Sequence, residues 1–252
     1  MKDLTIIIPI KELREDKDTG MLYRALNSTK GNDVIIIGPK SVLENIKLDE
    51  SYKVDLVYND SNTDYPYQVN MAVNSVKTKY FSVLEYDDYF SEKWFDNVEK
   101  YIKYDTNDVF AFLPLTEIVD YETNSTIGYS NEAVWASSFS EETGYFDLKS
   151  MKDYLTFNTS GGIFNTYEFQ KLGGLKNSMK LVFWLEFIKR ALYNNKSIFV
   201  IPKIGYYHVV NRNGSMTSEY AETMSSKEAE WWIDLSEKEY FFKQDRNKIY
   251  EE

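Results

Sequence analysis

The sequence contains no cysteine, and it is poor in glycine, proline and histidine. Its 252 residues include 11 Gly, 5 Pro and a single histidine, His208. The absence of cysteine excludes disulfide bonds, thiolate nucleophiles and cysteine-ligated zinc sites. With so little glycine and proline the chain has no low-complexity linker, and its 43% hydrophobic content is enough to bury a sizeable core.

Positive charge and long apolar runs are also scarce. The formal net charge is −11 and no run of Lys or Arg offsets it, which disfavours non-specific binding to nucleic acid phosphates. No apolar run reaches the roughly 18 residues of a membrane-spanning helix. The N-terminal segment 1–9 is interrupted too early to serve as a signal peptide, so we expect a cytoplasmic protein.

Two nucleotide-binding signatures are missing as well. The first predicted strand is not followed by Gly-x-Gly-x-x-Gly, the fingerprint of dinucleotide-binding folds. The sequence also lacks Gly-Lys-Ser/Thr, which excludes a P-loop nucleoside triphosphatase.

Apolar runs and amphipathic stretches alternate through the first third of the chain. Buried strands are predicted where the sequence is continuously apolar, at 4–10, 34–37, 54–57 and 80–85. Helices are predicted between them: one through Leu22 and Leu26, a short one over 41–46, and one that begins near Pro66. This alternation is typical of an α/β protein with a Rossmann-like, mostly parallel central sheet and helices on both faces.

The rest of the chain is predicted to be more mixed. A helix follows Ser91, which we expect to act as its N-cap. Further strands are predicted at 109–115, 160–164 and 198–202, further helices at 167–172 and 180–194, and a small antiparallel hairpin from 118–121 and 127–129. No element is predicted for 131–150. The tail, 225–250, is predicted to be an amphipathic helix that packs on the domain or on a partner, including a second copy in a homo-oligomer.

The segment 80–88 is an apolar strand that ends in three carboxylates within four positions. Glu85, Asp87 and Asp88 would repel one another and lose solvation unless a cation joined them. Oxygen ligands suit a hard divalent ion such as Mg²⁺ or Mn²⁺, and open α/β sheets place their ligands at the carboxyl ends of strands. The alternative is a strand that runs into an acidic turn and caps the next helix.

In order along the chain, these motifs resemble the family 2 glycosyltransferases of the GT-A fold. The resemblance rests on Thr5-Ile6-Ile7-Ile8-Pro9, Ile35-Ile36-Ile37, Val83-Leu84-Glu85-Tyr86-Asp87-Asp88, Gly161-Gly162, Gly173-Gly174 and the segment 181–216. It implies a single catalytic domain over 1–216, in which 1–110 bind the nucleotide sugar and 111–216 bind the acceptor. Residues 217–252 form a helical extension outside the resemblance.

The resemblance also implies a reaction and a cofactor. A sugar would move, with inversion, from a nucleotide-diphosphate sugar (a UDP-sugar is favoured) to a hydroxyl acceptor, with Mn²⁺ or Mg²⁺. Asp87 would hold the cation and Asp88 would assist it as a further ligand. Glu85, at the place of the commoner Asp, and Tyr86 would face the donor.

Donor recognition is implied at the ends of the first strands. The candidates there are Pro9, Lys11, Glu12 and Gly38. Many family members have Asp-Asp-Gly-Ser at the second strand end, where this chain has Gly38-Pro39-Lys40-Ser41. Gln68 and Asn70, on the helix before the acidic strand, are candidates to read the base instead. The alternative is that these amides only solvate the start of that helix.

An inverting transfer needs a general base, which the resemblance implies near the start of a late helix. Glu186 is the only acid in 181–190 and lies opposite the apolar stripe of that helix. Its alternative role is an exposed ion pair with Arg190, one turn on. Phe183 and Phe187 on the same side favour the base, because a desolvated carboxylate has a raised pKa.

The segment 205–216 follows the last predicted strand and is a candidate phosphate loop. Arg212 offers a forked donor to phosphate, and Ser215 follows Gly214 in a position to offer backbone N–H groups. His208 is a candidate metal ligand, although a lone histidine is more often a packed side chain.

Two other functions remain open at this point. A sugar nucleotidyltransferase is expected to have a glycine-rich loop after the first strand. It is disfavoured because the corresponding segment, Ile10-Lys11-Glu12-Leu13, contains no glycine. A non-catalytic sugar-nucleotide or glycan-binding module would fit the missing Asp at position 85 and the missing Glu-Asp pair in the late helix. The acceptor is a glycan, a protein, a small molecule or a modified nucleic acid.

Overall fold

The computed structural model describes residues 1–14, 16–105, 108–152, 154–212 and 223–250. Within these residues a nine-stranded sheet has the order β3-β2-β1-β4-β8-β6-β9-β5, and β7 pairs with β6. Its strands are β1 (Leu4–Pro9), β2 (Asp33–Gly38), β3 (Val54–Tyr58), β4 (Tyr80–Val83), β5 (Tyr89–Phe90), β6 (Ala111–Asp120), β7 (Thr126–Ser130), β8 (Ile163–Asn165) and β9 (Ile198–Val210). The helices are α1 (Asp16–Ser28), α2 (Lys40–Leu43), α3 (Tyr65–Val73), α4 (Trp94–Tyr104), α5 (Thr166–Lys171), α6 (Phe183–Tyr193) and α8 (Ser226–Tyr250).

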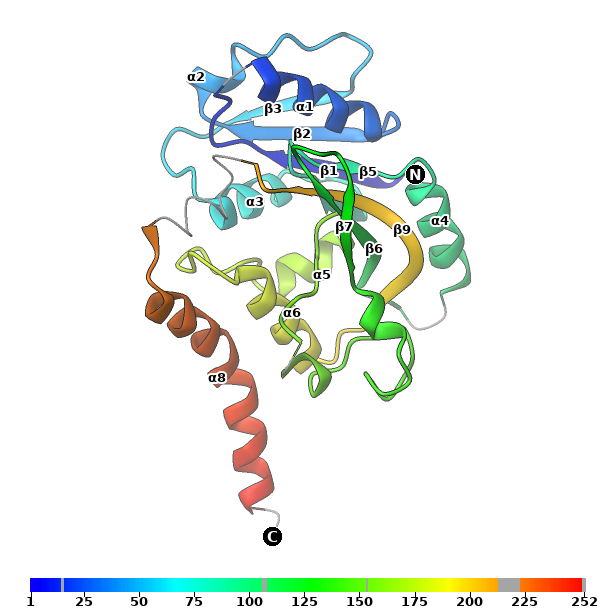
Figure 1. Cartoon of the computed structure of the whole chain (residues 1–252), viewed down its shortest axis with the longest axis vertical. Helices are drawn as coiled ribbons and strands as arrows, with labels where there is room; N and C mark the ends of the chain where they lie inside the picture. The colour runs from blue at the N-terminus through cyan, green and yellow to red at the C-terminus, as the bar shows by residue number, and fades with distance from the viewer. Residues whose placement is uncertain (15, 106–107, 153, 213–222, 251–252) are drawn as a thin grey trace.

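The first half is parallel, as the continuous apolar runs predict. β1 lies between β2 and β4 and is parallel to both. Because side chains alternate along a strand, Ile7 packs in the core on the side of α3, whereas Ile6 and Ile8 pack in the core on the side of α1. The predicted α/β fold of GT-A type, with helices on both faces of the sheet, is confirmed (Figure 1).

The second half contains the predicted antiparallel hairpin and one long strand. β6 and β7 pair antiparallel, and Glu117 lies opposite Tyr129. The prediction that the last strand ends at residue 202 is wrong. β9 continues to Val210 because it pairs with β6 along its whole length and also with β5. His208 therefore lies on a strand and not in a loop.

Three local predictions also differ from the structure. Ser91 does not cap a helix with its side chain, because its Oγ donates to the carbonyl of Ile204 on β9. The predicted helix 180–194 begins only at Phe183, since Val182 has a left-handed φ of 52°. The segment 131–150, for which no element was predicted, contains the short 3₁₀ turn Glu132–Trp135, and a second one begins at Ser150.

The tail forms the predicted helix, and its first half is part of the domain. Trp232 and Tyr240 of α8 are buried, and Glu237 accepts a hydrogen bond from the fully buried Lys189 of α6 at 2.6 Å. Figure 1 shows the C-terminal half of α8 projecting from the end of the molecule opposite to α1 and α2. No helix in the described part of the chain is both long enough and apolar enough to cross a membrane.

Candidate metal and diphosphate site

Three acids gather where β4 ends and the chain turns toward β5. Glu85, Asp87 and Asp88 can each offer an oxygen such that all three atoms lie within 4.8 Å of one another. The turn is closed by the N–H of Asp88, which donates to the carbonyl of Glu85 at 3.0 Å. β4 is the neighbour of β1 on the side away from β2, so the acids lie at the point where the strand order reverses. Open α/β sheets place their ligands there.

Asp88 is anchored to β9 through both oxygens. Its Oδ1 accepts the backbone N–H of Val209 at 2.7 Å, and its Oδ2 lies 2.9 Å from His208 Nδ1. Burial opposes protonation of His208, but the carboxylates of Asp88, Glu85 and Asp87 outweigh it and raise the pKa of His208 to about 9. Asp88 and His208 are therefore an ion pair at neutral pH, in which Asp88 is buried and His208 is half-buried.

Asp87 is held by two arginines. Arg212, two residues beyond β9, donates from Nε to Asp87 Oδ2 at 2.8 Å. Arg24 of α1 donates to the backbone carbonyl of Asp87 at 2.6 Å. A second acid, Asp18 of α1, lies 3.7 Å from Nη1 of Arg212, and the ring of Tyr86 lies 5.2 Å from the guanidinium. The cluster thus joins β4, β9 and α1.

The pKa of Glu85 is strongly raised. Burial raises its pKa, and the neighbouring Asp88 and Asp87 raise it further, to about 8. Burial also raises the pKa of Asp87. Carboxyl groups that resist ionisation in this way gain from a cation, and an all-oxygen donor set matches Mg²⁺ or Mn²⁺. The residues present therefore fit the divalent ion that the sequence predicts.

Comparisons with known proteins support the fold. No protein-family model matches the sequence, and no curated protein sequence is similar to it. Among solved structures, S. aureus TarS 1–349 in complex with UDP-GlcNAc aligns with a TM-score of 0.61 at 16% identity, over 86% of this chain and 61% of that chain. TarS 1–349 in complex with UDP aligns with a TM-score of 0.60 at 15% identity, over 93% and 78%.

This chain shares the fold of TarS. It spans less than two thirds of the TarS chain solved with UDP-GlcNAc and 48% of a longer TarS structure. At 14–16% identity the likeness to TarS concerns the fold.

The residues predicted at the first strand ends lie at the carboxyl edge of the sheet. Pro9 ends β1 and Gly38 ends β2. Gly38 has a packing reason to be glycine, because a Cβ there would lie 2.3 Å from the carbonyl oxygen of Ile10. Lys11 is exposed, and Glu12 forms an ion pair with Arg14. Ser215 lies outside the described residues.

The two amides of α3 have structural contacts. Gln68 is buried and donates to the carbonyl of Thr63 at 2.9 Å, which holds the loop before α3. Asn70 accepts from the N–H of Leu175 at 2.8 Å and donates to its carbonyl at 2.7 Å. Because both ends of its amide are used in this way, Asn70 does not fit the predicted role of reading a base.

Glu186 also differs from its predicted role. It is 1% exposed and accepts hydrogen bonds from Arg190 and from the hydroxyl of Tyr240 on α8. Lys176 Nζ lies 2.9 Å from the same carboxylate. These contacts disfavour the predicted role of general base, because the carboxylate is enclosed by the protein and already paired with Lys176 and Arg190. They also correct the alternative of an exposed ion pair, because the pair with Arg190 is buried.

Sequence reasoning missed Asp18 and Arg24. Both lie on α1, which was predicted only as a packing helix, and their contacts with residues 212 and 87 span 194 and 63 residues of sequence. The one available signal is Asp18, a charged residue that stands four positions before Leu22 and eight before Leu26, on the apolar stripe of α1.

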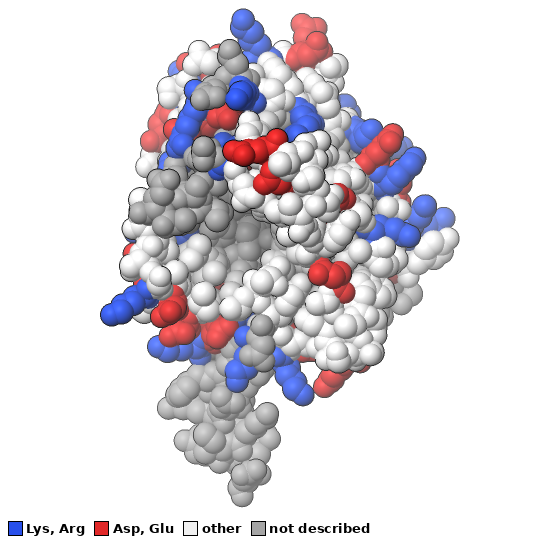
Figure 2. Space-filling model, in the orientation of Figure 1, with Lys and Arg blue, Asp and Glu red and all other residues white. Residues whose placement is uncertain are grey.

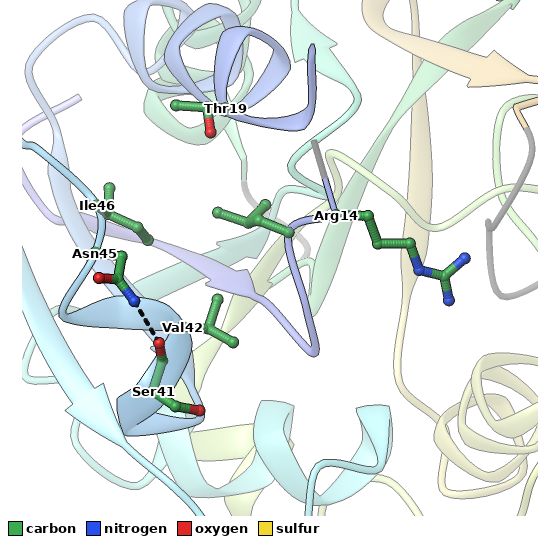
Figure 3. Close-up of a pocket in the computed structure, with 7 residues that line it drawn as sticks. Arg14, Thr19, Ser41, Val42, Asn45 and Ile46 are labelled. Atoms are coloured by element: carbon green, nitrogen blue, oxygen red, sulfur yellow. Dashed lines mark hydrogen bonds between the residues drawn. The ribbon is translucent and has the colours of Figure 1, made fainter. Parts of the chain in front are cut away.

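A separate pocket lies between the start of α1 and the segment that contains α2. It has a volume of about 330 Å³ and is lined by Leu13, Arg14, Thr19, Ser41, Val42, Asn45 and Ile46. Figure 3 shows the side chain of Arg14 pointing away from it. The pocket thus lacks an inward charge for a diphosphate. On the face seen in Figure 2, basic and acidic side chains are intermixed, without a continuous basic stripe for a nucleic acid backbone.

Proposed function

We propose that the chain is a metal-dependent glycosyltransferase that takes a sugar from a nucleotide-diphosphate sugar, with a UDP-sugar favoured, and transfers it with inversion to a hydroxyl acceptor. The observation that carries this proposal is the acid group at the end of β4, which includes two carboxyl groups of raised pKa. The shared fold with TarS, which has been solved with UDP-GlcNAc and with UDP, supports the choice of donor.

The proposed roles follow from the contacts. Asp87 and Asp88 hold the cation, and Glu85 completes the group toward the donor ribose. The bound cation would supply a positive charge that neutralises the departing diphosphate. His208 fixes the orientation of Asp88, and Arg212 offers the diphosphate a forked donor. The strand ends at Pro9, Lys11, Glu12 and Gly38 face the nucleoside, and residues 111–216 provide the acceptor side.

The contacts of Glu186 favour a second candidate function. With that carboxylate enclosed by Arg190, Lys176 and Tyr240, the first turn of α6 retains no acid for an acceptor hydroxyl. A chain that binds the donor without transferring its sugar would keep the acid cluster of β4 and need no base.

Thermal melting with nucleotide tests donor and metal binding. We expect UDP to raise the melting temperature only with Mn²⁺ or Mg²⁺, and Asp87→Ala to abolish the shift, because Asp87 holds the cation in the proposal. At a ligand concentration of about 100 Kd the stabilisation is about 2.7 kcal/mol. Asp55→Ala, which changes an exposed acid on β3, is the matched control. A shift of equal size in the presence of a chelator contradicts the metal assignment.

A panel of nucleotide sugars separates the two candidates. For a transferase we expect slow hydrolysis of one donor by the wild-type chain with Mn²⁺, and release of the sugar with the anomeric configuration inverted, as read by NMR. Tight binding of a donor without any turnover would support the binding module instead. Release with retained configuration would contradict the inverting mechanism.

A further inference from the structure

Arg212 occupies the position in the acid cluster that a cation would take. It is only 8% exposed, so its guanidinium points into the protein. Its Nε donates to Asp87 Oδ2 at 2.8 Å, and its Nη1 lies 3.7 Å from Oδ1 of Asp18. The guanidinium also lies over the ring of Tyr86. A positive charge from the protein thus already sits on the carboxylate that the proposed function gives to the metal.

Binding two cations to that carboxylate at once is electrostatically unfavourable. A guanidinium and a divalent ion on one group repel each other, and the low polarity of a buried site strengthens the repulsion. A metal that arrives alone therefore competes for Asp87 with Arg212, which holds Oδ2 of that carboxylate in a charge-assisted hydrogen bond.

A diphosphate changes this competition between Arg212 and the metal ion for Asp87. Its oxygens match the forked donors of a guanidinium, so that Arg212 can leave Asp87 for a new anion instead of remaining a buried charge with fewer partners. The metal then gains access to Asp87 while Arg212 stays paired.

We propose that Arg212 is an internal cation that holds Asp87 until metal and diphosphate arrive together, and that it makes their binding mutually dependent. This inference rests on the proposed function and adds a role to Arg212 beyond phosphate contact. Because binding linkage is reciprocal, the metal must strengthen nucleotide binding by the same factor by which the nucleotide strengthens metal binding.

Direct metal binding tests the inference without any assay of activity. Free Mn²⁺ is measured by electron paramagnetic resonance as it is titrated with wild-type chain or with Arg212→Gln, alone and with saturating UDP. We expect Arg212→Gln to bind Mn²⁺ alone about 10- to 100-fold more tightly than the wild type, since a charge-assisted hydrogen bond no longer competes. UDP should then strengthen Mn²⁺ binding much less in the variant than in the wild type.

Two further variants provide a charge control and a second test of the competition for Asp87. Lys203→Gln removes the same charge from an exposed site on β9 and should change neither quantity. Asp18→Asn keeps Arg212 but weakens its anchoring, so it should also tighten the binding of Mn²⁺ alone. Asp18→Asn reports on the same competition if Arg212→Gln does not fold.

The outcomes distinguish this inference from the function on which it rests. Unchanged affinity for Mn²⁺ alone in both Arg212→Gln and Asp18→Asn, or an unchanged effect of UDP, overturns the role of Arg212 while leaving the metal site intact. Failure of the wild-type chain to bind Mn²⁺ even with UDP overturns the proposed function and this inference together.

Discussion

Glu85 and His208 make the stability of the folded chain depend on pH in the same direction. The pKa of Glu85 is raised from 4.5 to about 8, mainly by burial, so the folded chain keeps a proton that the unfolded chain releases. Stability therefore falls as the pH rises from about 4.5 to about 8. The pKa of His208 is raised from 6.5 to about 9, so its stabilising contribution is complete below pH 6.5 and is lost as the pH rises through 9.

The substitution Glu85→Gln isolates the first of these effects. Without divalent ions we expect the variant to melt a few degrees above the wild type at pH 8, because it carries no buried charge, and to lose this advantage near pH 4.5. Melting temperatures recorded across this pH range provide the measurement. Glu50→Gln, at an exposed position, should leave the pH dependence as it is. An unaltered slope in Glu85→Gln would show that Glu85 ionises normally in the folded chain.

Arg24 and Asp18 show why part of the site could not be predicted. The density of acids at 85–88 is visible in the sequence, so the metal candidates were found from local spacing. The cations that hold those acids come from α1 and from the end of β9, and no periodicity relates residue 87 to residues 24 or 212. Only the packing of α1 and β9 against the end of β4 brings them together.

Among the elements, α8 is joined to the domain through buried side-chain contacts with α6. Tyr240 is buried on α6 and donates its hydroxyl to Glu186, which also binds Arg190. Arg190 in turn donates to the carbonyl of Gly174 at 2.7 Å, so the contact continues from α8 through α6 into the loop before it. The last helix thus supports α6 and the loop that precedes it.

Removal of one hydroxyl tests this support. We expect Tyr240→Phe to lower the free energy of unfolding by about 1–3 kcal/mol, because it withdraws a buried hydrogen bond from a carboxylate. Urea denaturation measures the change, and Tyr167→Phe, at a position 67% exposed, is the control that should stay near the wild type. Equal stability of both variants would mean that α8 contributes little through this contact.

The success of sequence reasoning also varied among the elements. Strands that are buried on both faces, such as β1 and β2, carry continuous apolar runs and were predicted near their true bounds. β9 was predicted too short because beyond residue 202 it contains the exposed Lys203 and the half-buried His208, so that the part paired with the end of β6 lacks an apolar run. Glu186 was taken as a base because a single helix shows its own faces but not the neighbour, α8, that covers one of them.

For the whole molecule, the two halves predicted from the sequence form one body. β8 of the later half pairs with β4 of the earlier half, and β5 pairs with β9. The core on each face of the sheet also contains residues from both halves, such as Ile7 with Val200 and Ile8 with Ile201. The boundary near residue 110 therefore divides roles in the proposed function but does not divide the structure.

The position of β9 inside the sheet sets the order in which the molecule can be completed during synthesis. Asp87 and Asp88 leave the ribosome well before their partners Arg212 and His208, which follow 125 and 120 residues later. Until β9 enters between β6 and β5, the nascent chain carries three crowded acids without these cations, and β5 lacks its partner strand. Such distant pairings make the final step of folding slow. The acid cluster can therefore be completed only after β9 has been made, and a nascent chain that ends before residue 198 has the acids of the site but lacks the strand that holds them.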